Sequence, residues 1–302
     1  MSARHRRAGL RRVLSLGLVL GLTAFAVPNA QQAATNAALV KVRGAEGVDP
    51  DDGVVWILAL GSDARPGQSI LRSRADAIQL VGMNLRTGDA TIVGIPRDSY
   101  VAVPGFGRDK VNAAMVYGGP QLMARAVGGM VGLTPDYVFT TDFLGFQAMV
   151  KAMDEVTVYS PFSWSIPVAT VRRGQNSLNG AEALAFARER YSLPGGDFDR
   201  SRDQGYLLEG GLRRVRELTR EPGTLERLLA SFVDNTFVDV PPAELYRLAR
   251  AVLEVEPTAV SVCVLRGTTG SAGGASVVFA DIAQARSIID RARDDARLEG
   301  GC

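Results

Sequence analysis

Histidine is almost absent from this chain of 302 residues, and lysine is rare. The one histidine is His5, inside an arginine-rich N-terminal stretch, and the lysines are Lys41, Lys110 and Lys151. A Ser-His-Asp triad, a Cys-His pair and a histidine-ligated zinc site are therefore excluded from the folded part. Any acid–base chemistry must use Asp, Glu, Lys, Tyr or Arg. Most of the cations are arginines, which suit two-point binding of phosphate or carboxylate.

An excess of positive charge is also missing once the N-terminus is set aside. The chain has a formal charge of +2, and residues 1–30 carry five arginines and no acid, so the remainder carries −3. Nucleic-acid binders usually show a basic balance or a basic face. We therefore expect no nucleic-acid partner.

The N-terminus joins a basic segment, residues 1–12, to an uninterrupted run of apolar and small residues from Val13 to Val27. Pro28 ends any helix there. This pattern predicts, for residues 1–30, either a secretory signal cleaved near Ala24-Phe25-Ala26 or a short retained membrane anchor. In both cases the arginines stay in the cytoplasm and the rest is exported, to the outer face of the cell membrane or beyond it.

Cysteine is scarce as well, since Cys263 and Cys302 are the two in the chain. They form no metal-type cluster, and the outside of a cell permits disulfides. Our hypothesis is that they pair and tie the C-terminal tail to a strand. Two unrelated thiols are the alternative.

Residues 31–53 are rich in Ala, Gln, Gly and Asp, and they predict a linker. From residue 54 on, short runs rich in Val and Ile alternate with segments of helical spacing, so residues 54–302 predict one α/β domain. The predicted strands are 54–60, 77–85, 90–95, 137–141, 156–159, 262–265 and 277–279, the last two closing the sheet. The predicted helices are 112–131, 143–153, 179–191, 201–220, 224–233, 241–254 and 281–298.

Charged side chains stand at the ends of the first three predicted strands. Asp63 and Arg65 follow the first, Asp76 opens the second, and Arg97 ends the third. The run Arg86–Asp89 predicts a tight turn, so the third strand runs antiparallel to the second. If the second strand also pairs antiparallel with the first or lies beside it, Asp63, Asp76 and Arg97 gather at one sheet edge. Two carboxylates there can hold Mg²⁺ together with substrate phosphates, which the arginines can bind at two points. Solvated ion pairs and turn caps are the alternative.

A second cationic group lies in the predicted helix 179–191 and the Gly-rich loop after it. Arg188 and Arg190 are two residues apart, so both can face one ligand only if the helix unwinds near Arg190, before Pro194. Arg200 follows the loop. The helix dipole explains one arginine in a last turn. Three arginines around one loop indicate an anion with several charges, such as a pyrophosphate.

Taken together and in order, these motifs resemble the LytR-CpsA-Psr family over about residues 54–210. The resemblance implies a single three-layer α/β/α domain with a central mixed sheet flanked by helices. It also implies a membrane-anchored enzyme at the cell wall of Gram-positive bacteria, which transfers a glycopolymer from a polyprenyl-pyrophosphate carrier to peptidoglycan. The matching runs are Gly61–Arg65, Arg74–Asp76, Ile95–Tyr100, Lys110–Ala114, Tyr117–Pro120, Leu178–Arg190 and Gly196–Arg200.

The resemblance also implies roles for individual residues. Asp63 and Asp76 would hold magnesium, with Arg65 and Arg97 beside it. For such a reaction, since the folded part has no histidine, a carboxylate is the natural candidate to take the proton of the acceptor hydroxyl, either Asp63 or Asp98. The residues expected to bind the pyrophosphate are Arg65, Arg97, Arg188, Arg190, Arg200 and Gln204.

The chain departs from the family pattern at two places. Met153–Val156 stands where Leu-Gly-Gly-Val is usual, and Asp203–Gly205 stands where Arg-Gln-Gln is usual, which removes a cation beside Gln204. The helices 112–131 and 143–153 are candidates to line an apolar groove for an isoprenoid tail. Two other functions stay open: a hydrolase acting on the same donor, and a non-catalytic exported binder of anionic glycolipids.

Overall fold

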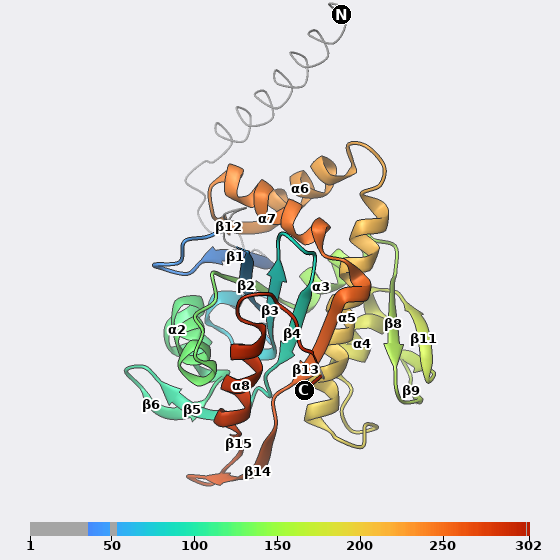
Figure 1. The fold of residues 1–302 in the computed structure, drawn as a ribbon. Coiled ribbons are helices and arrows are strands. Elements are labelled where there is room, and N and C mark those ends of the chain that lie inside the picture. Colours follow the sequence, from blue (N-terminus) through green and yellow to red (C-terminus); the bar gives the residue numbers. More distant parts are fainter. Residues whose placement is uncertain (1–35, 49–52, 300) are drawn as a thin grey trace, which may run out of the picture.

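A mixed β-sheet with helices packed on both faces forms the centre of the molecule (Figure 1). The computed structural model describes residues 36–48, 53–299 and 301–302. The predicted leader, residues 1–30, lies outside them. Among the described residues, no helix is both long and apolar enough to span a bilayer.

Seven strands form the central sheet, in the order β12-β1-β7-β2-β3-β4-β13. β2, β3 and β4 are an antiparallel meander, whose β3–β4 pair is the one that the turn at Arg86–Asp89 predicts, while β7 runs parallel to β2 and β13 runs parallel to β4. The ends of β2, β4, β7 and β13 therefore meet the start of β3 at one edge. The bounds are β1 Ala37–Lys41, β2 Val54–Ser62, β3 Ala75–Asn84, β4 Ala90–Gly94, β7 Tyr137–Thr141, β12 Thr236–Asp239 and β13 Val260–Val264.

The two faces of the sheet build two separate cores, because neighbouring residues of a strand point to opposite sides. In β2, Trp56 and Leu58 belong to the core beneath α2 and α8, whereas Val55 and Ile57 belong to the core beneath α5, α6 and α7. This is the expected three-layer α/β/α domain. The helices are α2 Ala113–Val131, α5 Asp197–Leu218, α6 Thr224–Asn235, α7 Pro242–Glu254 and α8 Ile282–Ala292.

A third, smaller core lies beside α5, among short helices and hairpins. Trp164 stacks on Phe186 there, with their ring centroids 6.2 Å apart, and Leu207 of α5 packs into the same cluster. This layer forms a wall opposite the sheet. Its elements are α3 Phe143–Ala152, α4 Gly180–Arg188, the pair β8 Val156–Ser160 and β11 Gly174–Leu178, and the pair β9 Trp164–Ile166 and β10 Ala169–Val171.

Two further hairpins extend from the lower end of the molecule in Figure 1. The first pairs β5 (Tyr100–Val103) with β6 (Gly107–Lys110), and the second pairs β14 (Gly267–Ala272) with β15 (Ala275–Ala280). Residues 277–279 therefore belong to a separate hairpin, and the prediction that they close the central sheet is wrong. Apolar periodicity indicates a strand but does not identify its partner.

The linker prediction for residues 31–53 is wrong for Ala37–Lys41. This segment is β1, which lies inside the sheet between β12 and β7. Ala37, Ala38, Leu39 and Val40 are all buried. A strand that is buried on both faces lacks the alternation of polar and apolar residues that identifies a half-exposed strand. Five apolar residues within a polar stretch are also too few to indicate a strand by themselves. The folded domain therefore includes residues before 54.

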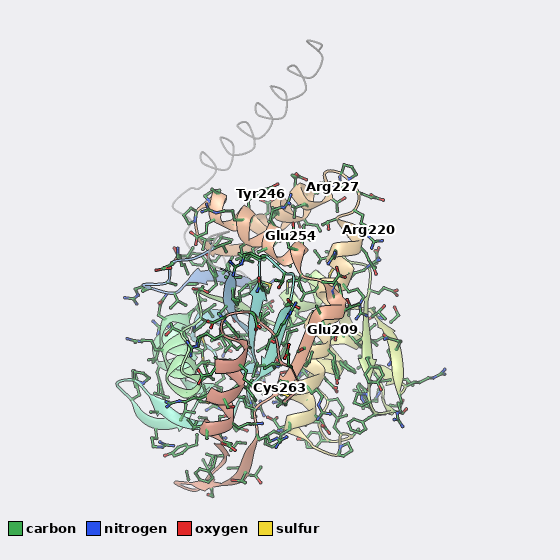
Figure 2. All side chains as sticks on the ribbon, viewed as in Figure 1. Glu209, Arg220, Arg227, Tyr246, Glu254 and Cys263 are labelled. Atoms are coloured by element: carbon green, nitrogen blue, oxygen red, sulfur yellow. A yellow bond between two sulfur atoms is a disulfide. The ribbon has the colours of Figure 1, made fainter. Side chains whose placement is uncertain are left out.

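Cys263 and Cys302 form a disulfide, as the hypothesis from the sequence states. Cys263 lies on β13 (Figure 2), and the C-terminus lies beside that strand (Figure 1). The bond ties the end of the chain to an edge strand of the central sheet.

Candidate functional site

A β-bulge presents the first acidic residue of the site. Gly61 pairs with Ala77 and Ser62 pairs with Ala75, so Asp76 is the extra residue of β3 and has no partner in β2. Bulges bend a strand and re-aim its side chains. Asp76 contacts Arg97, which follows β4, and the carboxylate and guanidinium are 2.5 Å apart. The prediction that Asp76 and Arg97 lie together at one sheet edge is thus confirmed.

Asp63 lies in the loop after β2, where its backbone N–H donates to the carbonyl of Arg74 at 3.0 Å. Burial and then the charge of Asp76 raise the pKa of Asp63 above its ordinary value, although Arg74 and Arg97 act in the opposite direction. Asp63 and Asp76 are therefore close enough to repel each other. Among the described residues, Asp63 makes no ion pair.

Asp98 has a different environment from Asp63. Its carboxylate is 2.8 Å from the ammonium of Lys110, and 3.9 Å from Nε of Arg97. Burial alone would lower the pKa of Arg97, but the charges of Asp76, Asp98 and Asp197 outweigh it and raise that pKa. Asp98 therefore acts as a support that fixes Lys110 and Arg97.

The first turns of α5 supply the next group of polar side chains. Arg200 is buried and pairs with Asp197 at 2.5 Å. Burial lowers the pKa of Arg200, and the positive charges of Arg97 and Arg190 lower it further. Gln204 donates to the carbonyl of Ala187 at 2.9 Å, so its side chain joins α5 to the end of α4.

Arg188 and Arg190 are both directed to this region because α4 ends between them. Glu189 has φ −63° and ψ 135°, an extended conformation that ends the helix. The helix had to unwind here for Arg188 and Arg190, two residues apart, to face one ligand. The guanidinium of Arg188 lies over the ring of Phe143, 4.6 Å from its centroid, and that of Arg190 lies over Tyr191 at 4.8 Å. The predicted helix 179–191 is therefore shorter than expected.

A cavity of about 870 Å³ runs from these polar residues along α5. Its polar end includes Asp76, Arg97, Arg190 and Arg200, and Leu212 and Val215 lie farther along the same helix. The apolar walls come from α3, α4, α5 and the sheet face formed by β2, β3 and β7. Helix 143–153 thus lines the cavity as proposed, but helix 112–131 does not, because α2 covers the other face of the sheet. Further lining residues are Arg188, Gln204, Gln79, Phe139, Phe143, Phe146, Met149, Met153, Ile166 and Leu208.

Gln79 is a site residue that the sequence interpretation missed. It lies on β3, lines the cavity and donates to the carbonyl of Ser201 at 2.9 Å. Its position inside a predicted apolar strand was the available signal, since a polar residue there must find a partner. Buried atoms of Gln79, Arg97 and Arg200 have no hydrogen-bond partner within the part of the chain that the structure describes. This end of the cavity holds more hydrogen-bonding capacity than the protein itself satisfies.

Arg65 is a predicted site residue that the structure does not bring into this arrangement. Its side chain is exposed and does not line the cavity, and its backbone N–H donates to Gln68 in the loop. Asp63 and Asp98 flank the Asp76–Arg97 pair but are not part of the cavity wall either. The structure therefore brings Arg97, Arg188, Arg190, Arg200 and Gln204 together, with the acidic residues at their side.

The chain matches proteins of one family. A sequence model of the LytR_cpsA_psr family covers residues 23–294. Regulatory protein MsrR of Staphylococcus aureus is 34% identical over 174 residues, which are 56% of this chain and 52% of that protein. The polyisoprenyl-teichoic acid–peptidoglycan teichoic acid transferase TagU of Bacillus licheniformis is 33% identical over 155 residues, 51% of this chain and 50% of that protein. The chain spans about half the length of these curated relatives.

A solved structure shares the fold. The LytR-CPS2A-psr family protein YwtF (TagT), described with bound octaprenyl pyrophosphate lipid, has a TM-score of 0.63 and 22% identity, and the match covers 88% of this chain and 98% of that one. This likeness shows the three-layer architecture. Because the family model spans nearly all of the described residues as well, the chain belongs to the LytR_cpsA_psr family.

Proposed function

We propose that this protein is a phosphotransferase that moves a glycopolymer from a polyprenyl-pyrophosphate carrier to peptidoglycan. The observation that carries the proposal is the continuity of the cavity, which joins a cluster of arginines to long apolar walls. A lipid pyrophosphate has the same division into a polyanion and an apolar tail. The relative TagU is named as a transferase of this class, and TagT is described with a bound polyprenyl pyrophosphate.

The residues at the polar end have separate tasks in this reaction. Arg97, Arg190 and Arg200 would bind the non-bridging oxygens and stabilise the charge that builds on them. The acceptor hydroxyl oxygen forms a new bond to the phosphorus next to the glycan, and the bond from that phosphorus to the bridging oxygen breaks. Polyprenyl phosphate leaves with the electron pair. The glycan ends as a phosphodiester on the acceptor.

Asp63 is the better candidate to accept the proton of the hydroxyl. Asp98 already pairs with Lys110 at 2.8 Å, whereas Asp63 makes no ion pair within the described residues. Without a cation, burial and Asp76 raise the pKa of Asp63, and a cation bound to the same carboxylate would lower it. The choice of Asp63 therefore rests on its lack of an ion pair.

Magnesium fits the donor set beside these arginines. The described residues contain no cluster of three or more His, Cys, Asp or Glu side chains, but Mg²⁺ commonly uses one or two carboxylates and completes its shell with phosphate and water. Asp63 and Asp76 repel each other across the site, and a divalent cation would offset this repulsion. When bound by these two residues, it would add positive charge next to the pyrophosphate.

The N-terminal sequence pattern supports a location of this activity at the cell surface. A basic segment followed by an apolar run is expected to carry the domain across the membrane, as an anchor or as a cleaved signal. The lipid donor and the peptidoglycan acceptor are both on that side of the membrane.

A transfer assay with the purified full chain tests the proposal. The chain is mixed with a synthetic polyprenyl-pyrophosphoryl sugar, peptidoglycan fragments and Mg²⁺, with and without EDTA. We expect glycan on peptidoglycan, and a loss of about a hundredfold in rate for both Asp76→Asn and Arg97→Ala. Arg220→Ala is the matched control, because Arg220 is exposed and follows the opposite end of α5 (Figure 2).

The outcomes separate the alternatives. Release of polyprenyl phosphate without glycan on peptidoglycan would identify a hydrolase. Lipid binding without any turnover, unchanged in Asp76→Asn, would identify a binding protein and overturn the transferase.

A further inference from the structure

Phe106 at the tip of the β5–β6 hairpin and Tyr117 in α2 form an exposed pair of stacked aromatic rings. Phe106 and Tyr117 are 53% and 40% exposed, their ring centroids are 4.8 Å apart, and their planes differ by 11°. Phe106 lies between Gly105 and Gly107, which both have a left-handed φ, and its N–H donates to the carbonyl of Val103 at 2.9 Å. The turn is therefore well defined, and it holds the large apolar side chain of Phe106 in an exposed position.

The hairpin that carries Phe106 starts and ends beside Asp98. The hairpin begins at Tyr100, two residues after Asp98, and ends at Lys110, which pairs with Asp98. The strand from Lys110 back to Phe106 extends about 13 Å at the usual rise per residue. A short oligosaccharide spans this distance. Phe106 thus lies one short oligosaccharide away from Lys110 and its partner Asp98, which flanks the Asp76–Arg97 pair.

Polar groups surround the ring stack. The hydroxyl of Tyr117 donates to Asp109 at 2.5 Å, and the guanidinium of Arg72 donates to the carbonyl of Tyr117 at 3.2 Å. Arg108 lies over the ring of Tyr100, 5.2 Å from its centroid. A sugar has an apolar C–H face and a rim of hydroxyl and amide groups. Flat aromatic rings can pack on that face, and the neighbouring hydrogen-bonding and charged groups can bind that rim.

The kink of α2 fixes the Phe106–Tyr117 stack relative to the loop that carries Asp63. Gly119 has φ 66° inside the helix, followed by Pro120, and a Cβ at Gly119 would lie 3.1 Å from the carbonyl of Leu71. The loop that carries Asp63 therefore packs against the same turn of α2 that carries Tyr117. A glycan bound to Tyr117 would keep a constant position relative to Asp63.

We propose that Phe106 and Tyr117 form the binding surface for the glycan strand that supplies the acceptor hydroxyl. This inference rests on the proposed transferase function and specifies the part of the protein that holds its second substrate. Asp109 and Arg72 orient the Tyr117 side of the surface. The cavity along α5 holds the donor, on the other side of the Asp76–Arg97 pair.

Direct binding tests the surface without any need for turnover. The full chain is sedimented with purified peptidoglycan sacculi from which attached polymers have been removed. We expect Phe106→Ala to weaken this binding about fivefold, which is the size of one aromatic stacking contact. Phe106→Trp should restore it, because the larger ring keeps the stack. Phe237→Ala is the matched control, since Phe237 is 42% exposed on β12 at the far end of the sheet.

Three further measurements make the test decisive. Thermal unfolding should give the same midpoint for Phe106→Ala and the parent chain. In the transfer assay, Phe106→Ala should raise KM for peptidoglycan and leave the affinity for the lipid donor unchanged. Vesicles of equal parts phosphatidylglycerol and phosphatidylethanolamine should bind the parent chain and Phe106→Ala equally.

The inference fails if sacculi bind Phe106→Ala as well as the parent chain, or if the substitution weakens binding to the vesicles alone, which would make the hairpin a membrane contact. Failure of the proposed function gives a different result. In that case the parent chain neither transfers glycan nor releases polyprenyl phosphate, whatever the sacculi show.

Discussion

At the scale of single residues, burial raises the pKa of two aspartates with different surroundings. Asp63 borders the Asp76–Arg97 pair, whereas Asp203 lies on α5, is 1% exposed, and has a carboxylate oxygen without a hydrogen-bond partner in the described part of the chain. Burial raises the pKa of Asp203 to about 7, with Asp199 adding to the effect and Arg202 opposing it. Asp203 is also the position where the family pattern has a cation.

Asp203 makes stability depend on pH. The unfolded chain loses this proton near pH 3.8 and the folded chain near pH 7. The folded state therefore holds more protons between these values, and its stability falls as the pH rises from about 4 to about 7. Asp203→Asn should be more stable than the parent chain above pH 7, by up to a few kcal/mol, and equal to it near pH 4. Urea unfolding at pH 4 and pH 8 measures this, and an equal difference at both values would contradict it.

The two arginines at the end of α4 differ in their exposure and in their neighbours. Arg190 is half-buried and close enough to Arg200 to affect its pKa, whereas Arg188 is exposed and packs on Phe143. Arg190→Gln should therefore weaken binding of a polyprenyl pyrophosphate more than Arg188→Gln. The expected loss for Arg190→Gln is about tenfold, the size of one hydrogen bond to a charged group. Titration with the lipid measures both, and the reverse order would refute this division of roles.

At the scale of elements, the contact between α5 and the sheet positions the cationic group. A Cβ at Gly94 of β4 would lie 2.5 Å from the hydroxyl oxygen of Ser201, which follows Arg200. Gln79 holds the same turn by donating to the Ser201 carbonyl. The absence of a side chain at Gly94 thus lets the first turns of α5 approach the strands that carry Asp76 and Arg97.

Gly94→Ala should displace this end of α5. We expect a loss of stability of about 1–3 kcal/mol from overpacking, together with weaker binding of the lipid donor. Gly129→Ala is the control, because Gly129 lies in α2 with open space around it, and this change should add about 1 kcal/mol of stability from helix propensity. Thermal unfolding and lipid titration measure both variants. Unchanged donor affinity in Gly94→Ala would show that the close approach does not position the arginines.

At the scale of the whole molecule, the disulfide links the last residue to the sheet. Cys263 is buried on β13, and 39 positions separate it from Cys302. A loop of this size restricts the unfolded chain by an amount worth roughly 4 kcal/mol in the chain-entropy description. Cys302→Ser should lower the free energy of unfolding by up to that amount. The parent chain unfolded under reducing conditions should match the variant, and no difference between oxidised and reduced protein would contradict the prediction.

Much of the site could be predicted from the sequence because the relevant information is local. The turn at Arg86–Asp89 predicts an antiparallel pair, and this pairing alone brings Asp76 and Arg97 to the same edge. The spacing of Arg188 and Arg190 requires the helix to end between them, as it does. The near absence of histidine excludes several catalytic classes whatever the fold.

Other features depend on contacts between segments that are distant along the chain. The position of β1 inside the sheet, the bulge that aims Asp76, and the pairing of Asp98 with Lys110 each require two or more separate segments to meet. The face of the sheet that α2 covers decides that α3, and not α2, lines the cavity.

The kinds of residue available for chemistry, the local elements that carry them and the order of the motifs all follow from the order of the amino acids. Contacts between distant segments set which of these residues share a cavity, which carboxylate is already paired, and where an exposed aromatic stack lies relative to them. The physical reason is that hydrophobic periodicity reports which side of an element is buried, but not what covers it. The shape of a binding site is set by what covers each face.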